Sequence, residues 1–305
     1  MLVLSGSNST ALCSKVCNIL KMKVGRVRFK EFGDKEKFVE VLDDVSNQEV
    51  VLIQSISTPT NDNLMELVLL SDALRRASAK RITIVAPYIG YSRQDRCSVR
   101  GAPLSFKIIA NFLSQTGADK LFTLDLHSEQ TQGLFNLGIC NLNSSSVFAE
   151  KLLAEAPTSS LIIVSPDCGS ATRARRLAQK LGCDTAIAGK MRLKDNSSKL
   201  LGINGSIEGM VCVVLDDIID TGSTISDVSK QLKLMGALRV CVYATHPILS
   251  NSTFCSKIPT SIDELVVTDS INFDPPKSTK IKIISIAGLL AEAIKRDASN
   301  PKINI

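Results

Sequence analysis

The sequence predicts an α/β protein built from mostly parallel sheets flanked by helices. Short runs rich in Val, Ile and Leu recur along the whole chain, and they alternate with longer segments of helical periodicity. Apolar strands interleaved with helices are typical of parallel sheets that are covered on both faces. A chain of 305 residues is also long enough for two domains, each with its own core. We therefore expect two α/β lobes.

The expected strands and helices follow one another in a regular order. The apolar runs that predict strands are 50–55, 82–87, 161–166, 211–217 and 239–246. The segments that predict helices are 62–77, 171–182 and 224–236. In open parallel sheets, ligands bind at the carboxyl ends of the strands. The motifs that could carry chemistry all follow such strand ends.

The two halves of the chain resemble each other. Residues 116–127 and 235–246 each contain Gly-Ala, a basic residue, an apolar strand and a His ten positions after the Gly. A duplicated lobe is the economical explanation. We expect an N-terminal domain at 1–145 and a C-terminal domain at 146–305.

Composition narrows the class of protein. Hydrophobic residues make up 44% of the chain, charged residues 22% and aromatic residues 4%, and there is no Trp. This suits a globular enzyme and disfavours base stacking on aromatic side chains. The net charge of +6 is spread without a basic run, so an anionic small substrate is expected rather than nucleic acid.

Cysteine usage and the apolar runs indicate a cytoplasmic location. The nine Cys are odd in number and include no C-x-x-C pair, so neither a disulfide framework nor a zinc site is indicated. The apolar run near the N-terminus is too short for a signal sequence, and no stretch reaches membrane-spanning length. We expect no membrane partner and a reduced compartment.

The segment "VVLDDIIDTGST", residues 213–224, combines two kinds of group. The stretch 213–216 is expected to be the end of a buried strand, and 221–224 a turn that opens a helix. The free amides of a helix N-terminus form an anion site, and Gly222 would let an anion approach the backbone closely. The acids Asp216, Asp217 and Asp220 then remain for hydroxyl groups or a metal. A sugar phosphate offers both features.

This segment resembles the type I phosphoribosyltransferase fold, and longer motifs narrow the resemblance. The stretches 57–96, 123–136, 165–182 and 243–246 together resemble the ribose-phosphate pyrophosphokinase family, from about Leu4 to Glu292. Members of this family transfer the pyrophosphoryl unit of ATP to the 1-hydroxyl of ribose 5-phosphate. They commonly form homo-oligomers, hexamers built from dimers, so the resemblance implies a homo-oligomer here.

The resemblance also implies roles for individual residues. The implied ribose 5-phosphate ligands are Arg192, Asp216, Asp217, Asp220, Thr221, Gly222, Ser223 and Thr224. The implied ATP ligands are Phe32, Asp34, Lys35, Glu36, Arg93, Gln94 and Arg96. The implied catalytic residues are Lys190 and Arg192, and the implied ligands of Mg²⁺ are His127 and Asp167.

Two of these sites have an alternative explanation without a catalytic or metal-binding role. Residues 189–199, "GKMRLKDNSSK", carry four cations with little apolar periodicity, which predicts a mobile loop; such a run is usually only a solvated basic loop. Mg²⁺ prefers oxygen ligands, so Asp167 suits it directly, whereas His127 could act on phosphate, through water or as a strand-end residue.

Three positions depart from the family pattern, and two other functions stay open. Lys35 stands where Gly is usual, Cys97 where Lys is usual, and Ser223 replaces the second Gly of the turn. These departures bear on nucleotide affinity more than on reaction type. The alternatives are a non-catalytic regulatory homologue of the same fold and a simple phosphoribosyltransferase.

Overall fold

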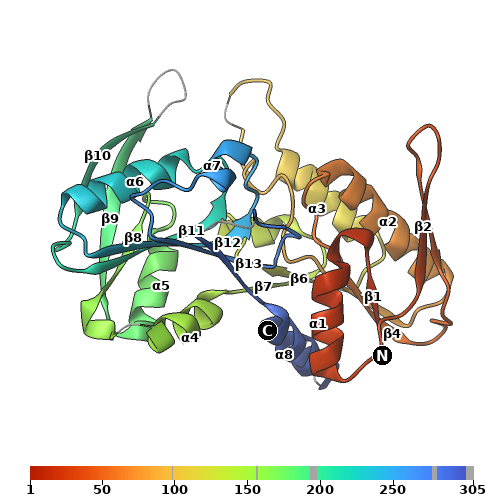
Figure 1. Cartoon of the computed structure of the whole chain (residues 1–305). Helices are drawn as coiled ribbons and strands as arrows, with labels where there is room; N and C mark the ends of the chain where they lie inside the picture. The colour runs from red at the N-terminus through yellow and green to blue at the C-terminus, as the bar shows by residue number, and fades with distance from the viewer. Residues whose placement is uncertain (98, 156, 193–197, 277–279, 300–305) are drawn as a thin grey trace. The chain divides into compact units, whose positions relative to one another are not determined.

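The computed structural model describes residues 1–97, 99–155, 157–192, 198–276 and 280–299. It has the predicted fold class, an α/β protein with two mostly parallel sheets flanked by helices (Figure 1). The chain divides into two compact units. Unit 1 comprises Met1–Leu142, Ser270–Asn272 and Ser285–Ile305, and unit 2 comprises Asn143–Asp269 and Phe273–Ile284. The C-terminal helix therefore belongs to unit 1, unlike in the predicted domain 146–305.

Unit 1 is built on a five-stranded sheet in which all neighbours are parallel. Its strands, in spatial order, are β1 (Leu2–Ser5), β4 (Glu49–Ile53), β5 (Arg81–Val85), β6 (Lys120–Leu124) and β7 (Gly138–Leu142). Its helices are α1 (Thr10–Leu20), α2 (Thr60–Arg76), α3 (Ser105–Gln115) and α8 (Ala287–Ser299), with 3-10 turns η1 (Ser7–Ser9) and η2 (Glu129–Leu134).

Both faces of this sheet are covered by helices. Val50 and Leu52 of β4 join one core with α2 and α3, while Val51 and Ile53 join the other core with α1 and α8. Successive residues of a strand point to opposite faces, so a run of apolar residues gives a strand that is buried on both sides. Helices α1 and α8 lie side by side (Figure 1).

Helix α8 is also held by a buried ionic contact. The Asp297 carboxylate lies 2.7 Å from Arg81 Nη2 and 2.8 Å from Lys120 Nζ, at the beginnings of β5 and β6. All three side chains are largely buried. Removing one partner of such a pair leaves an uncompensated charge in the interior, so the contact fixes α8 against the sheet.

Unit 1 also carries an antiparallel hairpin of β2 (Val27–Glu31) and β3 (Lys37–Val41). Val27, Val39 and Val41 pack against the core that contains α2. The opposite face carries the Arg28–Glu40 ion pair and the exposed Phe38. The hairpin therefore has one apolar and one polar, partly aromatic face.

Unit 2 is built on a seven-stranded sheet in which only the β9–β10 pair is antiparallel. Its strands, in spatial order, are β10 (Ser198–Asn204), β9 (Asp184–Arg192), β8 (Leu161–Ser165), β11 (Val211–Ile219), β12 (Arg239–Pro247), β13 (Glu264–Thr268) and β14 (Ile281–Ile284). Its helices are α4 (Ser145–Glu155), α5 (Ala171–Leu181), α6 (Ser223–Leu234) and α7 (Ser252–Ser256), with the 3-10 turn η3 (Thr158–Ser160).

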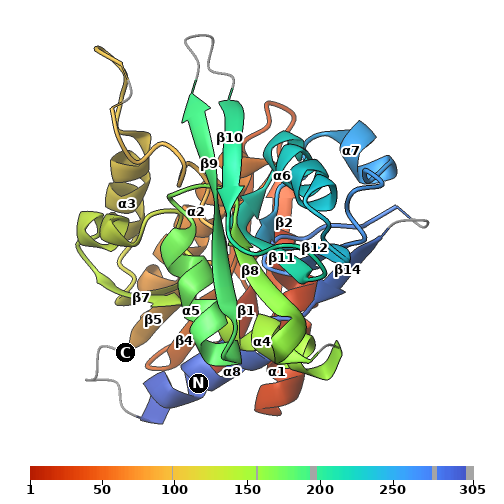
Figure 2. The same cartoon turned by 90° about the vertical axis from the view of Figure 1, so that its left-hand side faces the viewer.

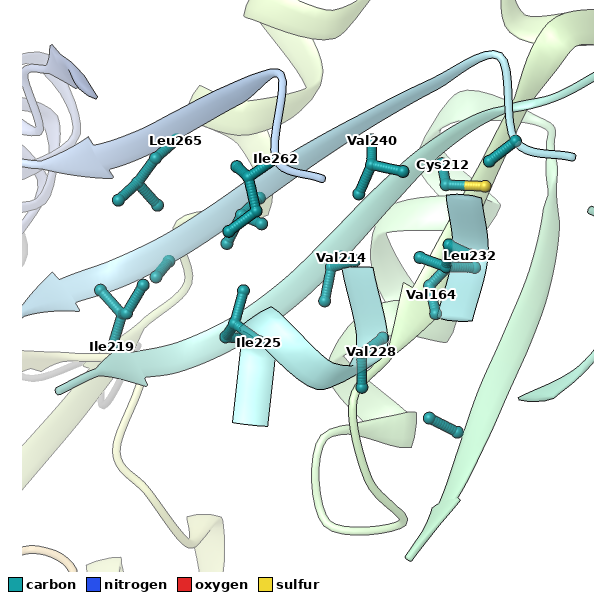
Figure 3. Close-up of a cluster of buried hydrophobic side chains, with 14 of the residues drawn as sticks. Val164, Cys212, Val214, Ile219, Ile225, Val228, Leu232, Val240, Ile262 and Leu265 are labelled. Carbon is teal, nitrogen blue, oxygen red and sulfur yellow. The ribbon is translucent and has the colours of Figure 1, made fainter. Parts of the chain in front are cut away.

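Two cores again sandwich the sheet. Val214 and Val240 pack with Val228 and Leu232 of α6 on one face (Figure 3). Strand residues such as Val213 pack with α4 and α5 on the other face. Figure 2 shows β9 and β10 as two long neighbouring strands, and they form one edge of this sheet.

The predicted correspondence between the two halves has a counterpart in the backbone. Gly117 follows α3 with φ +81°, and Gly236 follows α6 with φ +86°. Each stands three positions before its strand, β6 or β12. A positive φ at the end of a helix favours glycine, which explains why both segments carry it.

Six of the nine cysteines are buried, namely Cys13, Cys17, Cys140, Cys212, Cys241 and Cys255. Burial raises the pKa of the Cys212 and Cys241 thiols to about 11. These thiols therefore belong to the core. Among the residues that the structure describes, no helix is both long and apolar enough to cross a membrane.

Candidate active site

The three acids of the 213–224 segment lie on and just after β11. The sequence predicts that this strand ends at Asp216, but β11 continues to Ile219 because its pairing with β12 extends to Ile219↔Pro247. Its pairing with β8 on the other side runs only from Val211 to Val214. The prediction of the strand end was wrong because the partner strand decides where pairing stops.

Adjacent acids on β11 have different surroundings. Asp216 is partly exposed, and its Oδ1 accepts hydrogen bonds from Ser170 Oγ at 2.7 Å and from the Asp217 amide at 3.0 Å. The protein groups around its carboxyl partly exclude water and so raise the pKa of Asp216 above its ordinary value, and the neighbouring Asp217 adds to the effect. Asp217 is buried, and its Oδ1 lies 3.2 Å from Arg173 Nη1. A cation or a hydrogen-bond donor brought to Asp216 would favour its ionised form.

The turn between β11 and α6 presents hydroxyl groups at a helix N-terminus. Gly222 is the N-cap of α6 with φ +76°, and the helix begins at Ser223. The hydroxyls of Thr221 and Ser223 are exposed and lie 3.2 Å apart. The Asp220 carboxylate accepts hydrogen bonds from the hydroxyl and the amide of Ser250. Such a helix start suits an anion.

The structure gives a reason for Gly222 that the sequence did not show. A side chain at this position would overlap the ring of Phe254 on α7, which packs in the same core as α6. The positive φ adds a backbone requirement for glycine. Access of an anion to the Gly222 backbone remains a prediction.

The turn between β8 and α5 contains Asp167. Its Oδ1 accepts a hydrogen bond from the Ser170 amide at 2.9 Å, and its carbonyl oxygen accepts one from Ser165 Oγ at 2.6 Å. Ser170 therefore links two carboxylates, because its amide holds Asp167 while its hydroxyl holds Asp216. Asp167 itself is partly exposed.

Three residues with contacts to these acids were missed from the sequence: Ser170, Arg173 and Ser250. Ser170 and Arg173 lie at the start of α5, within a basic helical stretch whose cations have no distinctive spacing. Ser250 follows β12 and is brought to Asp220 only by the fold. The one available signal was the position of Ser170 directly after the "SPDCG" turn.

The predicted loop at 189–199 is in large part a hairpin. Gly189–Arg192 belongs to β9, and Ser198 and Lys199 belong to β10, with Lys190 opposite Leu200 and Arg192 opposite Ser198. The loop prediction was wrong for these positions because pairing between the two strands overrides their weak apolar periodicity. Residues 193–197 lie outside the described residues.

Two groups of predicted ATP residues follow neighbouring strands of unit 1. Arg93, Gln94 and Arg96 are exposed in the connection after β5, where the Gln94 side chain accepts a hydrogen bond from Ser105 Oγ at 2.7 Å. His127 is exposed three residues after β6. Because β5 and β6 are parallel neighbours, both segments begin at the same edge of the sheet.

The remaining predicted ATP residues form the tip of the β2–β3 hairpin. The Phe32 amide donates to the Glu36 carbonyl at 2.9 Å, which closes the turn around Asp34 and Lys35. Lys35 has φ +74°, a conformation in which glycine is favoured, so its backbone follows the family pattern although its side chain does not. Its Nζ lies 2.7 Å from Glu31 Oε1.

The two predicted metal ligands, His127 and Asp167, belong to different units. Within the described ranges, no group of three or more His, Cys, Asp or Glu side chains is placed to hold a metal ion. Mg²⁺ commonly keeps several waters and binds through one or two carboxylates plus substrate phosphates. The partly exposed Asp167, with oxygen donors, fits that chemistry.

The scaffold and its strand-end sites define the class of protein: an α/β protein with parallel sheets whose polar segments gather at the carboxyl ends of the strands. Comparison with known proteins narrows this class. Residues 1–117 match the model of the N-terminal domain of ribose phosphate pyrophosphokinase, and residues 190–303 match that of the phosphoribosyl synthetase-associated domain.

Full-length relatives agree with these matches. The ribose-phosphate pyrophosphokinase of Agrobacterium fabrum is 39% identical over 306 residues, with 100% of this chain and 99% of the relative covered. That of Burkholderia pseudomallei is 41% identical, with 97% and 94% covered. The crystal structure of phosphoribosylpyrophosphate synthetase from Mycobacterium smegmatis superposes with a TM-score of 0.90 at 30% identity, covering 98% of this chain and 99% of that one. This chain belongs to the ribose-phosphate pyrophosphokinase family.

Proposed function

We propose that this protein transfers the pyrophosphoryl group of ATP to the 1-hydroxyl of ribose 5-phosphate, giving 5-phosphoribosyl 1-pyrophosphate and AMP. The 1-hydroxyl oxygen bonds to the β-phosphorus of ATP, the bond from that phosphorus to the α-phosphate oxygen breaks, and the hydroxyl proton is released. The observation that carries the proposal is the 39% identity to a ribose-phosphate pyrophosphokinase along the whole chain.

The β11–α6 turn is the proposed ribose 5-phosphate site. The amides at the start of α6 and the exposed hydroxyls of Thr221 and Ser223 would hold the 5-phosphate, with Gly222 and Thr224 in the same turn. Asp216 and Asp220 would accept hydrogen bonds from the sugar hydroxyls. Both acids already accept a hydrogen bond from a serine hydroxyl, Asp216 from Ser170 and Asp220 from Ser250. A sugar hydroxyl could donate the same kind of hydrogen bond to either carboxylate.

Lys190 and Arg192 on β9 are the proposed catalytic residues. Phosphoryl transfer passes through a loose transition state in which charge accumulates on the phosphoryl oxygens, so positioned cations lower the barrier without covalent chemistry. Antiparallel pairing with β10 gives the backbone of both residues a defined register. Arg192 would also contact ribose 5-phosphate.

Unit 1 is the proposed source of the nucleotide ligands. Arg93 and Arg96 could each make planar two-point contacts with phosphate oxygens, beside Gln94. The hairpin-tip residues Phe32, Asp34, Lys35 and Glu36 are the other proposed ATP ligands.

The metal site is proposed separately. Asp167 of unit 2 would hold Mg²⁺, and His127 would contact the ion or the phosphates. When bound, the ion would neutralise charge on the transferred group.

The test is an assay for AMP. Ribose 5-phosphate, ATP and Mg²⁺ supplied together should yield AMP and 5-phosphoribosyl 1-pyrophosphate in equal amounts, and omission of any one should abolish both. A regulatory homologue would bind ATP without forming AMP. A simple phosphoribosyltransferase would instead consume 5-phosphoribosyl 1-pyrophosphate with a base and release pyrophosphate.

The proposal extends to assembly and location. We infer a cytoplasmic homo-oligomer, a hexamer as the family resemblance implies, working in nucleotide biosynthesis. Light scattering of the purified protein should give six times the chain mass of 32.9 kDa. A mass equal to one chain would contradict this part of the proposal.

A further inference from the structure

Asp216 and Asp217 are adjacent in sequence, yet β11 directs them to different surroundings. Alternate residues of a strand point to opposite faces. Asp217 follows the parity of Val213 and Leu215, which pack in the core with α4 and α5. Asp216 is partly exposed instead. A ligand can therefore reach the Asp216 carboxylate more easily than the Asp217 carboxylate.

The described contacts of Asp217 lead into α5. Its Oδ1 lies 3.2 Å from Arg173 Nη1, and the two side chains are only 4% and 13% exposed. Two charges buried together are retained only when each satisfies the other, and loss of one leaves the other uncompensated. Asp217 thus has a protein partner from a neighbouring helix and little surface to offer a sugar.

Arg173 lies within the first turn of α5, three positions after the N-cap residue Ser170. Ser170 holds Asp216 through its hydroxyl at 2.7 Å and Asp167 through its amide at 2.9 Å. An ion pair between Arg173 and Asp217 therefore fixes the start of α5 against β11, at the point where Ser170 reaches Asp216. This geometry connects the buried pair to the partly exposed Asp216 carboxylate through a single turn of helix.

We propose that Asp217 is a positioning residue that acts through Arg173, and that it does not itself bind the ribose. The pair holds the first turn of α5 so that Ser170 orients Asp216, which receives the sugar hydroxyl. This inference rests on the proposed function for the identity of the sugar. It changes the role that the family resemblance implies for Asp217.

The test is a double-mutant cycle with Asp217→Asn, Arg173→Gln and the combination of both. Asn keeps the shape of Asp, and Gln is a shorter, uncharged replacement for Arg. Either single variant leaves one buried charge without its counter-ion, whereas the combined variant removes both charges together. Each variant is measured in three ways: affinity for ribose 5-phosphate and for ATP by calorimetry, hydrogen exchange of the 165–176 segment, and thermal unfolding. Arg173→Lys serves as the conservative variant.

We expect each single variant to weaken ribose 5-phosphate binding by at least about fivefold, the scale of coupling between contacting groups, with ATP affinity measured without Mg²⁺ within twofold. Amide exchange in the 165–176 segment should accelerate in the same variants. The combined variant should regain ribose 5-phosphate affinity to within about threefold of the original protein, because contacting residues are non-additive. Arg173→Lys should be intermediate.

Two results would overturn the inference. One is a well-folded combined variant that binds ribose 5-phosphate no better than Asp217→Asn, because the carboxylate would then be needed by the ligand itself. The other is unchanged exchange of the 165–176 segment in both single variants. An original protein that binds no ribose 5-phosphate would refute the proposed function instead, while the exchange data would still decide whether the pair positions α5.

Discussion

The segments β5–α3–β6 of unit 1 and β11–α6–β12 of unit 2 share a plan but differ in their first connection. Residues 86–104 join β5 to α3, whereas only residues 220–222 join β11 to α6. The short turn places the start of α6 directly at the strand end, so backbone amides are available there. The long connection carries exposed cations such as Arg93 and Arg96. Loop length thus decides whether backbone or side chains would meet an anion.

The histidines of the two segments differ in the same sense. His127 lies beyond β6 and is exposed, whereas His246 lies inside β12 and is 2% exposed. The strand pairing Ile218↔His246 extends β12 past the corresponding point in unit 1. A shared sequence spacing therefore leads to one surface residue and one core residue.

The largest expected effect concerns Lys190 on β9. The pair of strands β9 and β10 lies outside the two segments just compared, β5–α3–β6 and β11–α6–β12. Lys190→Ala should lower kcat by about 10²–10³, or roughly 2.7–4 kcal/mol, as expected for one lost electrostatic stabiliser of the transition state. KM values should change little, because the charge is needed chiefly as the transition state forms. Steady-state kinetics check this, with Lys230→Ala on the exposed face of α6 as the charge-matched control. A kcat within a few-fold and a raised KM for ATP would make Lys190 a ground-state ligand.

The next effect tests the short turn. Gly222→Ala should destabilise unit 2 by about 2–3 kcal/mol, since it adds left-handed backbone strain to overlap with the Phe254 ring. Gly236→Ala is the matched control, because its φ is also positive but its nearest neighbour is the flexible Glu208 side chain. Urea unfolding should show the smaller loss for Gly236→Ala. Equal losses would mean that Phe254 yields freely and that strain alone matters.

A third prediction separates the two histidines. His127→Ala should reduce kcat/KM by about 10–100-fold, the scale of a lost charged hydrogen bond, and leave thermal unfolding unchanged. His246→Ala should instead lower stability by about 1–3 kcal/mol, because it removes a buried side chain from β12. Kinetics and thermal unfolding of both variants check this. Equal losses of kcat in two equally stable variants would remove the asymmetry between the units.

The smallest effect concerns the hairpin of unit 1. Lys35→Gly should raise stability by up to about 1 kcal/mol, because the native φ of +74° favours glycine. The exposed ion pair with Glu31 offsets little of this gain. Thermal unfolding at low and high salt measures both contributions. A variant less stable than the original protein at high salt would show that the turn conformation is not strained by Lys35.

The fold class was predictable because the alternation of apolar runs with helical segments can be recognised in a single sequence. The ends of the strands were less predictable. Strand β11 continues to Ile219 because it pairs with β12, and Lys190 lies in a strand rather than a loop because β9 pairs with β10. Gly222 was identified, but the reason for it, the Phe254 ring, comes from a residue far along the chain. Ser170 and Arg173 went unnoticed because their partners are distant in sequence.

Helix α8 has a consequence for how the protein is made. The core between β1, β4, β5, β6 and α1 is completed by Leu290, Ala291 and Ile294 of α8, which are translated after the residues of unit 2. Until the ribosome has released this helix, Phe122 and Val51 face no partner from it, and Arg81 and Lys120 lack Asp297. Unit 1 therefore contains segments that are synthesised both before and after unit 2, and its core is complete only after unit 2 has been synthesised. A fragment that stops at Leu142 would expose this apolar surface to aggregation.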